Sequence, residues 1–149
     1  MQTVRLERGG KGATMKTMVD TNVLVYDAIE NSPHHYRACE IIDETGDPSI
    51  NSLSIVELGF VLPRYGIDKD NVALKLEEVL HSDYFTVSWL SAKMLEGTSA
   101  FIVENSLSFR DFNDWIIAYD AHSRNLPLVT FDKTLTKKCK KLGIEVIEG

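Results

Sequence analysis

The stretch that decides the fold is Asn113–Asp132, NDWIIAYDAHSRNLPLVTFD. Its first part has apolar residues at helical spacing, and a break at Asn125 separates it from the short apolar run Leu128–Phe131. This pattern predicts a helix that feeds a buried strand. One acid, Asp114, opens the helix and another, Asp132, directly follows the strand. Because a helix that returns into a strand folds its two ends together, we expect these two acids to approach each other.

Helices and strands alternate on the amino-terminal side of this stretch and continue after it. Short strands are predicted at residues 17–19, 49–51, 85–89, 128–131 and 144–147. Besides the helix of the opening stretch, helices are predicted at 23–29, 32–44, 53–62, 71–83, 91–105 and 134–142, with Ser32 and Ser52 as amino-terminal caps. Parallel strands need crossover connections, which helices supply. The sequence therefore predicts an α/β fold with three layers, α/β/α, around a central parallel sheet of about five short strands.

Length and composition indicate one domain. The chain has 149 residues and 44% hydrophobic residues, enough for one sizeable core. Residues 1–14 contain three glycines and no periodicity, so we expect a flexible tail followed by one domain over 15–149. No apolar run is long enough to span a bilayer, and no membrane association is expected. Cys39 and Cys139 form no CxxC motif, which favours reduced thiols in a cytoplasmic protein.

The charge pattern gives little sign of nucleic-acid binding. The formal net charge is −6, and a globally acidic chain does not attract phosphates by itself. The exception is Lys133–Lys141, which holds five lysines and no acid. A solvated helix face is the simpler interpretation of this run. Its position directly after Asp132 nevertheless puts it beside any pocket that this acid lines.

Two acids follow strands directly and so share one edge of the predicted sheet. Asp20 comes after the strand at 17–19, and Asp132 after the strand at 128–131. In open parallel sheets, ligands bind outside the carboxyl ends of the strands. Asp114 begins a helix face that should pack on the sheet, and Glu57 lies in the apolar helix SIVELGFVL, where an acid rarely lacks a partner.

Each of these acids also has a simpler structural role. Asp20 and Asp132 can cap helices, Asp114 can favour its helix amino terminus, and Glu57 can point to solvent. Taken together, however, they predict a cluster of carboxylates. Clustered carboxylates repel one another unless a cation neutralises them, and oxygen ligands suit Mg²⁺ or Mn²⁺. Such sites act on phosphates, which predicts metal-assisted phosphodiester chemistry.

The sequence resembles the PIN domain, and within it the VapC-type toxin ribonucleases. The resemblance rests on four segments in order: Val19–Leu24 (VDTNVL), SIVELGFVL around Glu57, NDWIIAYDAH from Asn113, and Thr130–Asp132. It implies a metal-dependent endoribonuclease that uses Mg²⁺ or Mn²⁺ and leaves a 3′-hydroxyl. It also implies a homodimer that cleaves RNA and is held inactive by a small antitoxin protein.

The resemblance further implies roles for individual residues. The catalytic and metal-binding set would be Asp20, Glu57, Asp114 and Asp132, with Thr130 and Asn22 in support. Trp115 and Tyr119 depart from the small residues usual in that helix, and Asp120 lies too far round it to join the set. Tyr26, Tyr36 and Tyr65 are interpreted as packing residues rather than base-stacking ones.

Four alternatives are weighed against this interpretation. A haloacid-dehalogenase-like phosphatase needs an acid at the position of Asn22, and a phospho-receiver domain has no role for Glu57. A silent PIN-like module that binds RNA or protein stays open, although it would not need all four acids. An RNA-processing or quality-control nuclease without an antitoxin also stays open, because the sequence does not separate it from a toxin.

Overall fold

The computed structural model describes residues 15–149, and the predicted tail over 1–14 lies outside the described residues. Within this part, one parallel sheet has the strand order β3-β2-β1-β4-β5. Its strands are β1 (Met15–Val19), β2 (Thr45–Asn51), β3 (Thr86–Ser88), β4 (Leu128–Thr130) and β5 (Val146–Glu148). The predicted parallel α/β sheet is confirmed.

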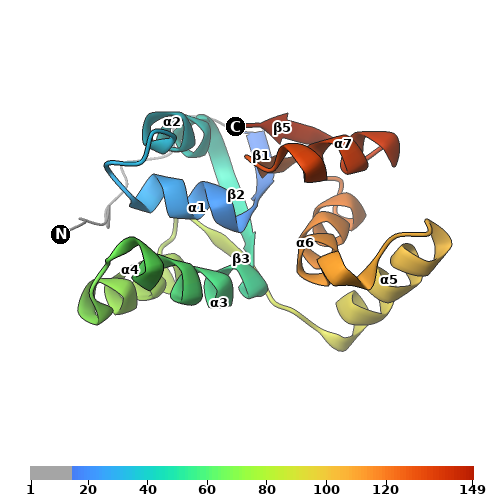
Figure 1. Cartoon of the computed structure of the whole chain (residues 1–149), viewed down its shortest axis with the longest axis horizontal. Helices are drawn as coiled ribbons and strands as arrows, with labels where there is room; N and C mark the ends of the chain where they lie inside the picture. The colour runs from blue at the N-terminus through green and yellow to red at the C-terminus, as the bar shows by residue number, and fades with distance from the viewer. Residues whose placement is uncertain (1–14) are drawn as a thin grey trace.

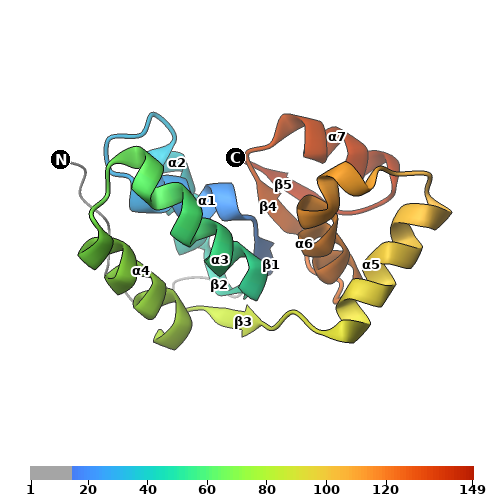
Figure 2. The same ribbon diagram turned by 60° about the horizontal axis from the view of Figure 1, so that its bottom comes forward.

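Helices cover both faces of the sheet (Figures 1 and 2). One side holds α1 (Thr21–Ala28), α2 (His35–Glu44), α3 (Ser52–Val61) and α4 (Lys69–His81), with the short 3-10 turn η1 (Leu62–Tyr65) between the last two. The other side holds α5 (Ala92–Glu104), η2 (Phe109–Asp111), α6 (Phe112–Ser123) and α7 (Lys133–Lys141). No helix among residues 15–149 has the length and apolar character needed to cross a membrane.

The sheet separates two hydrophobic cores because neighbouring strand residues point to opposite faces. Met18 and Leu128 are fully buried in the core of α5, α6 and α7. The next residues along each strand, Val19 and Val129, are fully buried in the core of α1 to α4. Met18 pairs with Leu128 and Val19 with Val129 across β1 and β4, so the two residues of each pair contribute to the same core.

Strand β2 begins at Thr45, earlier than the predicted Ser49. The prediction took Gly46, Asp47 and Pro48 as a chain break, yet Pro48 pairs with Thr17 of β1. Pro48 is tolerated because β3 pairs with β2 only from Ser49 onward, so no second strand flanks it there.

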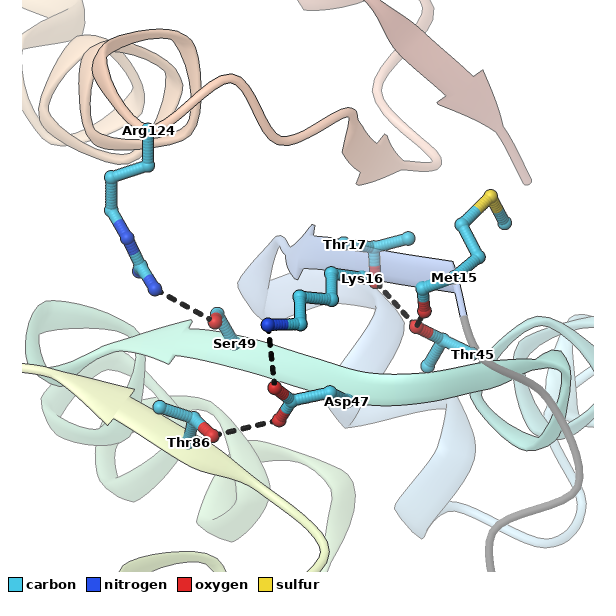
Figure 3. A network of polar contacts seen from close by, with 8 residues as sticks. All are labelled: Met15, Lys16, Thr17, Thr45, Asp47, Ser49, Thr86 and Arg124. Carbon is cyan, nitrogen blue, oxygen red and sulfur yellow. Dashed lines mark hydrogen bonds and ion pairs between the residues drawn. The ribbon is translucent and has the colours of Figure 1, made fainter.

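Side chains support this early part of β2 (Figure 3). The Thr45 hydroxyl donates to the carbonyl of Met15 at 2.6 Å, which ties the strand starts together. The Asp47 carboxylate accepts from the Thr86 hydroxyl at 2.8 Å and lies 4.0 Å from the Lys16 ammonium. These contacts replace part of the backbone pairing that the glycine and proline weaken.

Several helix boundaries differ from the predicted ones. The helix α1 starts at Thr21 rather than Val23, α2 at His35 rather than Ser32, and α3 is capped by Asn51 rather than Ser52. The starts of α1 and α3 are set by the side chains of Asp20 and Asn51, which accept from backbone N–H groups, whereas α2 has no side-chain cap. The Ser32 hydroxyl accepts from the N–H of His34 and stabilises a turn before α2.

Candidate active site

Strand pairing brings two of the predicted acids to one edge of the sheet. The N–H of Asp20 donates to the carbonyl of Val129 at 2.9 Å, so the carboxyl end of β1 lies beside that of β4. Asp132 follows two residues after the end of β4 and caps α7. Asp114 lies in the first turn of α6, the helix that returns to the start of β4. The expectation that chain direction alone brings Asp20 and Asp132 to the same edge of the sheet is met.

Glu57 reaches the same place from α3 through a contact that the sequence did not predict. The Thr21 hydroxyl donates to Glu57 Oε1 at 2.7 Å, which joins the start of α1 to the middle of α3. Glu57 is half-buried and does not project freely into solvent. The one sequence signal for Thr21 was its place between Asp20 and Asn22.

All four acids line one cavity of about 220 Å³. Its wall consists of Asp20, Thr21, Asn22, Val25, Tyr26, Glu57, Val61, Tyr65, Asp114 and Asp132. Of these ten described residues, none is basic. The cavity therefore concentrates negative charge without a cationic side chain in its wall.

Asp20 is the most constrained of the acids, with only 5% of its surface exposed. One carboxylate oxygen accepts from the N–H of Thr21 at 2.8 Å, and the other from the Thr130 hydroxyl at 2.7 Å. Burial raises the pKa of Asp20 to about 7, although these hydrogen bonds oppose the rise; the charges of Asp114 and Glu57 add to it.

Asn22 and Thr130 form a small polar network beneath Asp20. The Asn22 amide donates to the Thr130 hydroxyl at 3.2 Å, and its oxygen accepts from the N–H of Phe131 at 3.1 Å. The Thr130 hydroxyl also accepts from the N–H of Asp132 at 3.1 Å. The two predicted supporting residues thus connect both strand ends through hydrogen bonds.

Asp114 and Asp132 differ in their surroundings. Asp132 Oδ1 accepts from the N–H of Leu135 at 3.0 Å, so a helix cap fixes this side chain. The Asp114 side chain makes no hydrogen bond within residues 15–149, and burial followed by the charges of Asp132 and Glu57 raises its pKa to about 6. Lys138 opposes this rise, but its ammonium binds Asp111 at 3.1 Å and is only partly available to the site.

The residues fit a hard divalent cation in donor type and charge. The four carboxylates offer only oxygen, and burial, with the charges of neighbouring carboxylates, raises the pKa values of Asp20 and Asp114 in a cavity whose wall contains no basic residue. Within residues 15–149, however, no three His, Cys, Asp or Glu side chains are close enough to hold a metal ion together. The acids stand apart across the cavity, an arrangement that suits Mg²⁺, which keeps several waters and takes one or two carboxylates.

A sequence profile of the PIN domain matches residues 17–141. The chain belongs to the PIN-domain family. The matched segment contains all four cavity acids and the strands and helices that carry them. A search of curated proteins found no match.

Several solved PIN-domain structures resemble the fold. VapC20 of Mycobacterium tuberculosis, a sarcin-ricin loop cleaving toxin, aligns with a TM-score of 0.69 at 15% identity, over 82% of this chain and 94% of its own. VapBC2 of Rickettsia felis, bound to a DNA fragment from its promoter, gives 0.62 at 19% identity over 91% and 99%. A toxin-antitoxin complex from Klebsiella pneumoniae gives 0.60 at 20% identity over 88% and 95%.

The helix α6 departs from the small residues usual in PIN domains without disturbing the cavity. Trp115 is buried in the core, and Tyr119 packs where Gly97 of α5 leaves room for its ring. Asp120 is also buried, but its carboxylate accepts from the Asn51 amide at 2.9 Å and borders a different cavity. Leaving Asp120 out of the acid set therefore agrees with its position.

The aromatic residues near the cavity were only partly anticipated. Tyr26 and Tyr65 line it, so packing alone does not describe them. Tyr36 is 87% exposed on α2 and does not line it. The two tryptophans also differ, since Trp115 is buried while Trp89 is 64% exposed.

Proposed function

We propose that this PIN domain is a divalent-metal-dependent endoribonuclease and the toxin of a type II toxin-antitoxin pair. The observation that carries the proposal is the cavity at the carboxyl edge of the sheet, whose wall contains four carboxylates and no basic residue. Such a cavity repels a phosphodiester until a cation is bound. This electrostatic requirement supports the proposed metal dependence.

Asp20, Glu57, Asp114 and Asp132 would hold Mg²⁺ or Mn²⁺, directly or through water. A cation held by these residues would supply positive charge to the phosphate and to the leaving oxygen and would acidify a bound water molecule. The separation of the acids across the cavity supports a hydrated ion or more than one binding position rather than a closed cage.

The remaining polar residues hold the carboxylates in place. Thr130 and the N–H of Thr21 orient Asp20, the Thr21 hydroxyl orients Glu57, and the N–H of Leu135 orients Asp132. Because these donors are fixed by secondary structure, the acids need little reorganisation when charge develops on the substrate. Asp114 lacks such a donor and is the acid best able to accept a proton from an attacking water molecule.

The proposed biological role comes from the solved relatives. One is a toxin that cleaves the sarcin-ricin loop, and others are VapBC or toxin-antitoxin complexes. By analogy, RNA is the substrate and a small antitoxin protein is the inhibitor. The further proposal that the active species is a homodimer rests on the sequence resemblance alone. The exposed side chains of Val56 and Phe60 on α3 offer apolar surface for such contacts.

The test combines cleavage with metal binding. Wild-type protein is incubated with single-stranded RNA and Mn²⁺, with and without chelator, beside Asp20→Asn and Asp132→Asn. Asp70→Asn is the control, because Asp70 is exposed in the first turn of α4, and it does not line the cavity. Calorimetry of Mn²⁺ binding, without RNA, gives a readout that is independent of turnover.

We expect chelator-sensitive cleavage by wild type and Asp70→Asn. The cleavage rate of both cavity variants should fall by about 100-fold or more, which is the order of magnitude expected when one contact to the transition state is lost. Cleavage that is equal in Asp20→Asn and wild type would contradict the site. A toxin also predicts that expression alone arrests growth. Normal growth during expression of an active enzyme would contradict the toxin role and favour an RNA-processing nuclease.

A further inference from the structure

Two tyrosines form the outer wall of the acid-lined cavity. Tyr26 lies one helical turn beyond Asn22 on α1, and Tyr65 lies four residues beyond Val61, where α3 continues into η1. All four residues border the same cavity. One turn of helix spans about 5.4 Å, so Tyr26 lies about one turn beyond Asn22 on α1, and Tyr65 lies about two turns beyond Glu57 along α3 and η1.

The Tyr26 ring is held in place by other aromatic residues. Phe131 meets it edge-on at a centroid distance of 5.0 Å and an angle of 86°. His34 lies 4.7 Å from it at 46°. These contacts support one side of Tyr26, which fixes the ring while part of it remains exposed.

Tyr65 has no such support. It is 40% exposed and makes no aromatic ring contact within the described residues. Neither tyrosine hydroxyl makes a hydrogen bond in residues 15–149, although both side chains border a cavity rich in carboxylates. Burial, followed by the nearby Tyr65, raises the pKa of Tyr26, which is consistent with two phenols that lie close together.

We propose that Tyr26 and Tyr65 bind the base of the nucleotide next to the scissile phosphate, with their rings stacking on it. The inference rests on the proposed ribonuclease function and deepens it. The carboxylates and their cation would bind the phosphate but provide no contact for the RNA base. Flat aromatic rings beside them provide the contact that a splayed base needs.

The proposed ligand is single-stranded RNA. Stacking on a ring requires an open base face, which a base inside a duplex does not offer. The two tyrosines lie further along α1 and η1 than the polar cavity residues Asn22 and Glu57, which suits a nucleotide whose phosphate binds at the acids and whose base lies beside the rings. A protein partner would not need aromatic rings placed beside a phosphate-binding site.

The experiment measures equilibrium binding of a short fluorescent oligoribonucleotide in Ca²⁺, which fills oxygen sites while hydrolysis is suppressed. Wild type is compared with Tyr65→Leu and Tyr65→Phe. Tyr36→Leu is the matched control, because Tyr36 is 87% exposed on α2 and does not line the cavity. Tyr65 is chosen because it lacks ring contacts, so its replacement leaves the aromatic packing around Tyr26 intact.

We expect Tyr65→Leu to bind RNA about tenfold more weakly, as for one stacked base, and Tyr65→Phe and Tyr36→Leu to stay within about twofold of wild type. An abasic oligonucleotide should lose more affinity for wild type than for Tyr65→Leu, because one of the two rings that contact the base is already gone in the variant. Mn²⁺ turnover should show a raised KM in Tyr65→Leu with kcat largely kept.

The outcomes separate this inference from the proposed function. Normal RNA binding by Tyr65→Leu, with wild type active, overturns the stacking role and leaves the ribonuclease intact. An equal loss in Tyr65→Phe and Tyr65→Leu also overturns stacking, since the ring is kept in the first. A wild type that neither binds nor cleaves RNA contradicts the ribonuclease proposal itself.

Discussion

At the scale of single residues, the environment of Asp20 links function to stability. Its pKa is raised from 3.8 in an unfolded chain to about 7 in the metal-free fold. A raised pKa means that folding favours the protonated form. The favourable contribution is fully present below pH 3.8 and is lost as the pH rises through 7, with each unit of difference worth about 1.4 kcal/mol.

We therefore predict that Asp20→Asn flattens the pH dependence of stability in chelator. The free energy of unfolding of wild type should fall between pH 4 and 7 relative to the variant, on the order of 1 kcal/mol or more. Thermal or urea unfolding across this range measures it. Added Mn²⁺ at pH 8 should raise the Tm of wild type and not of Asp20→Asn; parallel pH profiles for the two proteins would argue against an uncompensated charge at this position.

The two cysteines differ in their expected reactivity. Cys139 is fully buried, and burial, with the charges of Asp20, Asp114 and Asp132, raises the pKa of its thiol to about 12. Cys39 is partly exposed, and its sulfur lies 3.5 Å from a ring nitrogen of His35. Because the thiolate is the reactive form, we predict that iodoacetamide at pH 8 modifies Cys39 alone.

Mass spectrometry of tryptic peptides measures this labelling. Cys139 should become reactive only after denaturation, and Cys39→Ser should remove the fast reaction. Rapid labelling of Cys139 in the native protein would show that α7 opens away from the core.

Residue-level prediction from sequence succeeded where chain direction decides the position. Asp20 and Asp132 follow adjacent strands, so their shared edge needed only the βα order. It failed for Thr21, whose contact with Glu57 joins residues 36 positions apart. It failed also for Tyr65, because its place in the cavity wall depends on how α3 continues into η1. Such contacts depend on packing between helices, which periodicity does not encode.

At the scale of elements, Asn51 connects the helices that carry two of the acids. Its side-chain oxygen accepts from the N–H of Leu53 at 2.9 Å and caps α3, which carries Glu57. Its amide nitrogen donates to the buried carboxylate of Asp120 on α6, the helix of Asp114. One side chain thus fixes the relative position of both helices.

We predict that Asn51→Ala lowers the free energy of unfolding by about 2–4 kcal/mol. A lost cap costs about 1 kcal/mol, and a buried carboxylate without its donor adds about 1–3. Asp68→Ala is the control, because Asp68 caps α4 at an exposed position and should lose only the cap contribution. Urea unfolding compares them; equal losses in the two variants would mean that Asp120 relaxes to water.

The contact between α5 and α6 depends on the absence of a side chain at Gly97. An added Cβ would lie 2.5 Å from the Tyr119 hydroxyl oxygen and 2.7 Å from two ring carbons. We predict that Gly97→Ala destabilises the protein by about 1–3 kcal/mol from overlap, less the gain of about 1 kcal/mol in helix propensity.

The effect of Gly97→Ala on the free energy of unfolding should change from destabilising to stabilising when the Tyr119 ring is removed. In a Tyr119→Ala background, Gly97→Ala should stabilise the fold by up to about 1 kcal/mol, because only the helix propensity remains. A double-mutant cycle by thermal unfolding measures the coupling. A cost of Gly97→Ala that persists in the Tyr119→Ala background would place the overlap elsewhere.

Element types were largely predictable, whereas their boundaries were not. The helices and strands have the expected order because apolar spacing and turn residues reflect local physics. The start of β2 escaped prediction because Pro48 is a strand breaker by propensity. Only the pairing register shows that β3 pairs with β2 from Ser49 onward, so that Pro48 has no partner residue on β3.

At the scale of the whole molecule, an acidic chain concentrates five of its 16 lysines and arginines in one segment. The net charge is −6, yet the α7 segment holds five lysines. Lys138 and Lys140 pair with Asp111 and Glu148. Lys133 and Lys137 are exposed and make no ion pair within the described residues. They border a hollow that also touches Thr130, the support of Asp20.

We predict that these two lysines guide the RNA backbone toward the acid-lined cavity. Lys133→Ala/Lys137→Ala should weaken RNA binding at low salt by about tenfold and reduce the slope of log affinity against log salt by about 1.4, as for two lost contacts to a single strand. Titrations of labelled RNA at several salt concentrations measure both quantities. Binding of Mn²⁺ alone should not change, because neither lysine lines the cavity.

Lys16→Ala/Lys93→Ala is the matched control for net charge. Lys16 lies at the amino end of β1, away from the carboxyl edge, and Lys93 is exposed in the first turn of α5. This variant removes the same two charges, so it should keep the wild-type salt slope if position matters. Equal slopes in both double variants would mean that only net charge governs RNA affinity, and the α7 lysines would then be a solvated helix face, as in the simpler interpretation of their sequence.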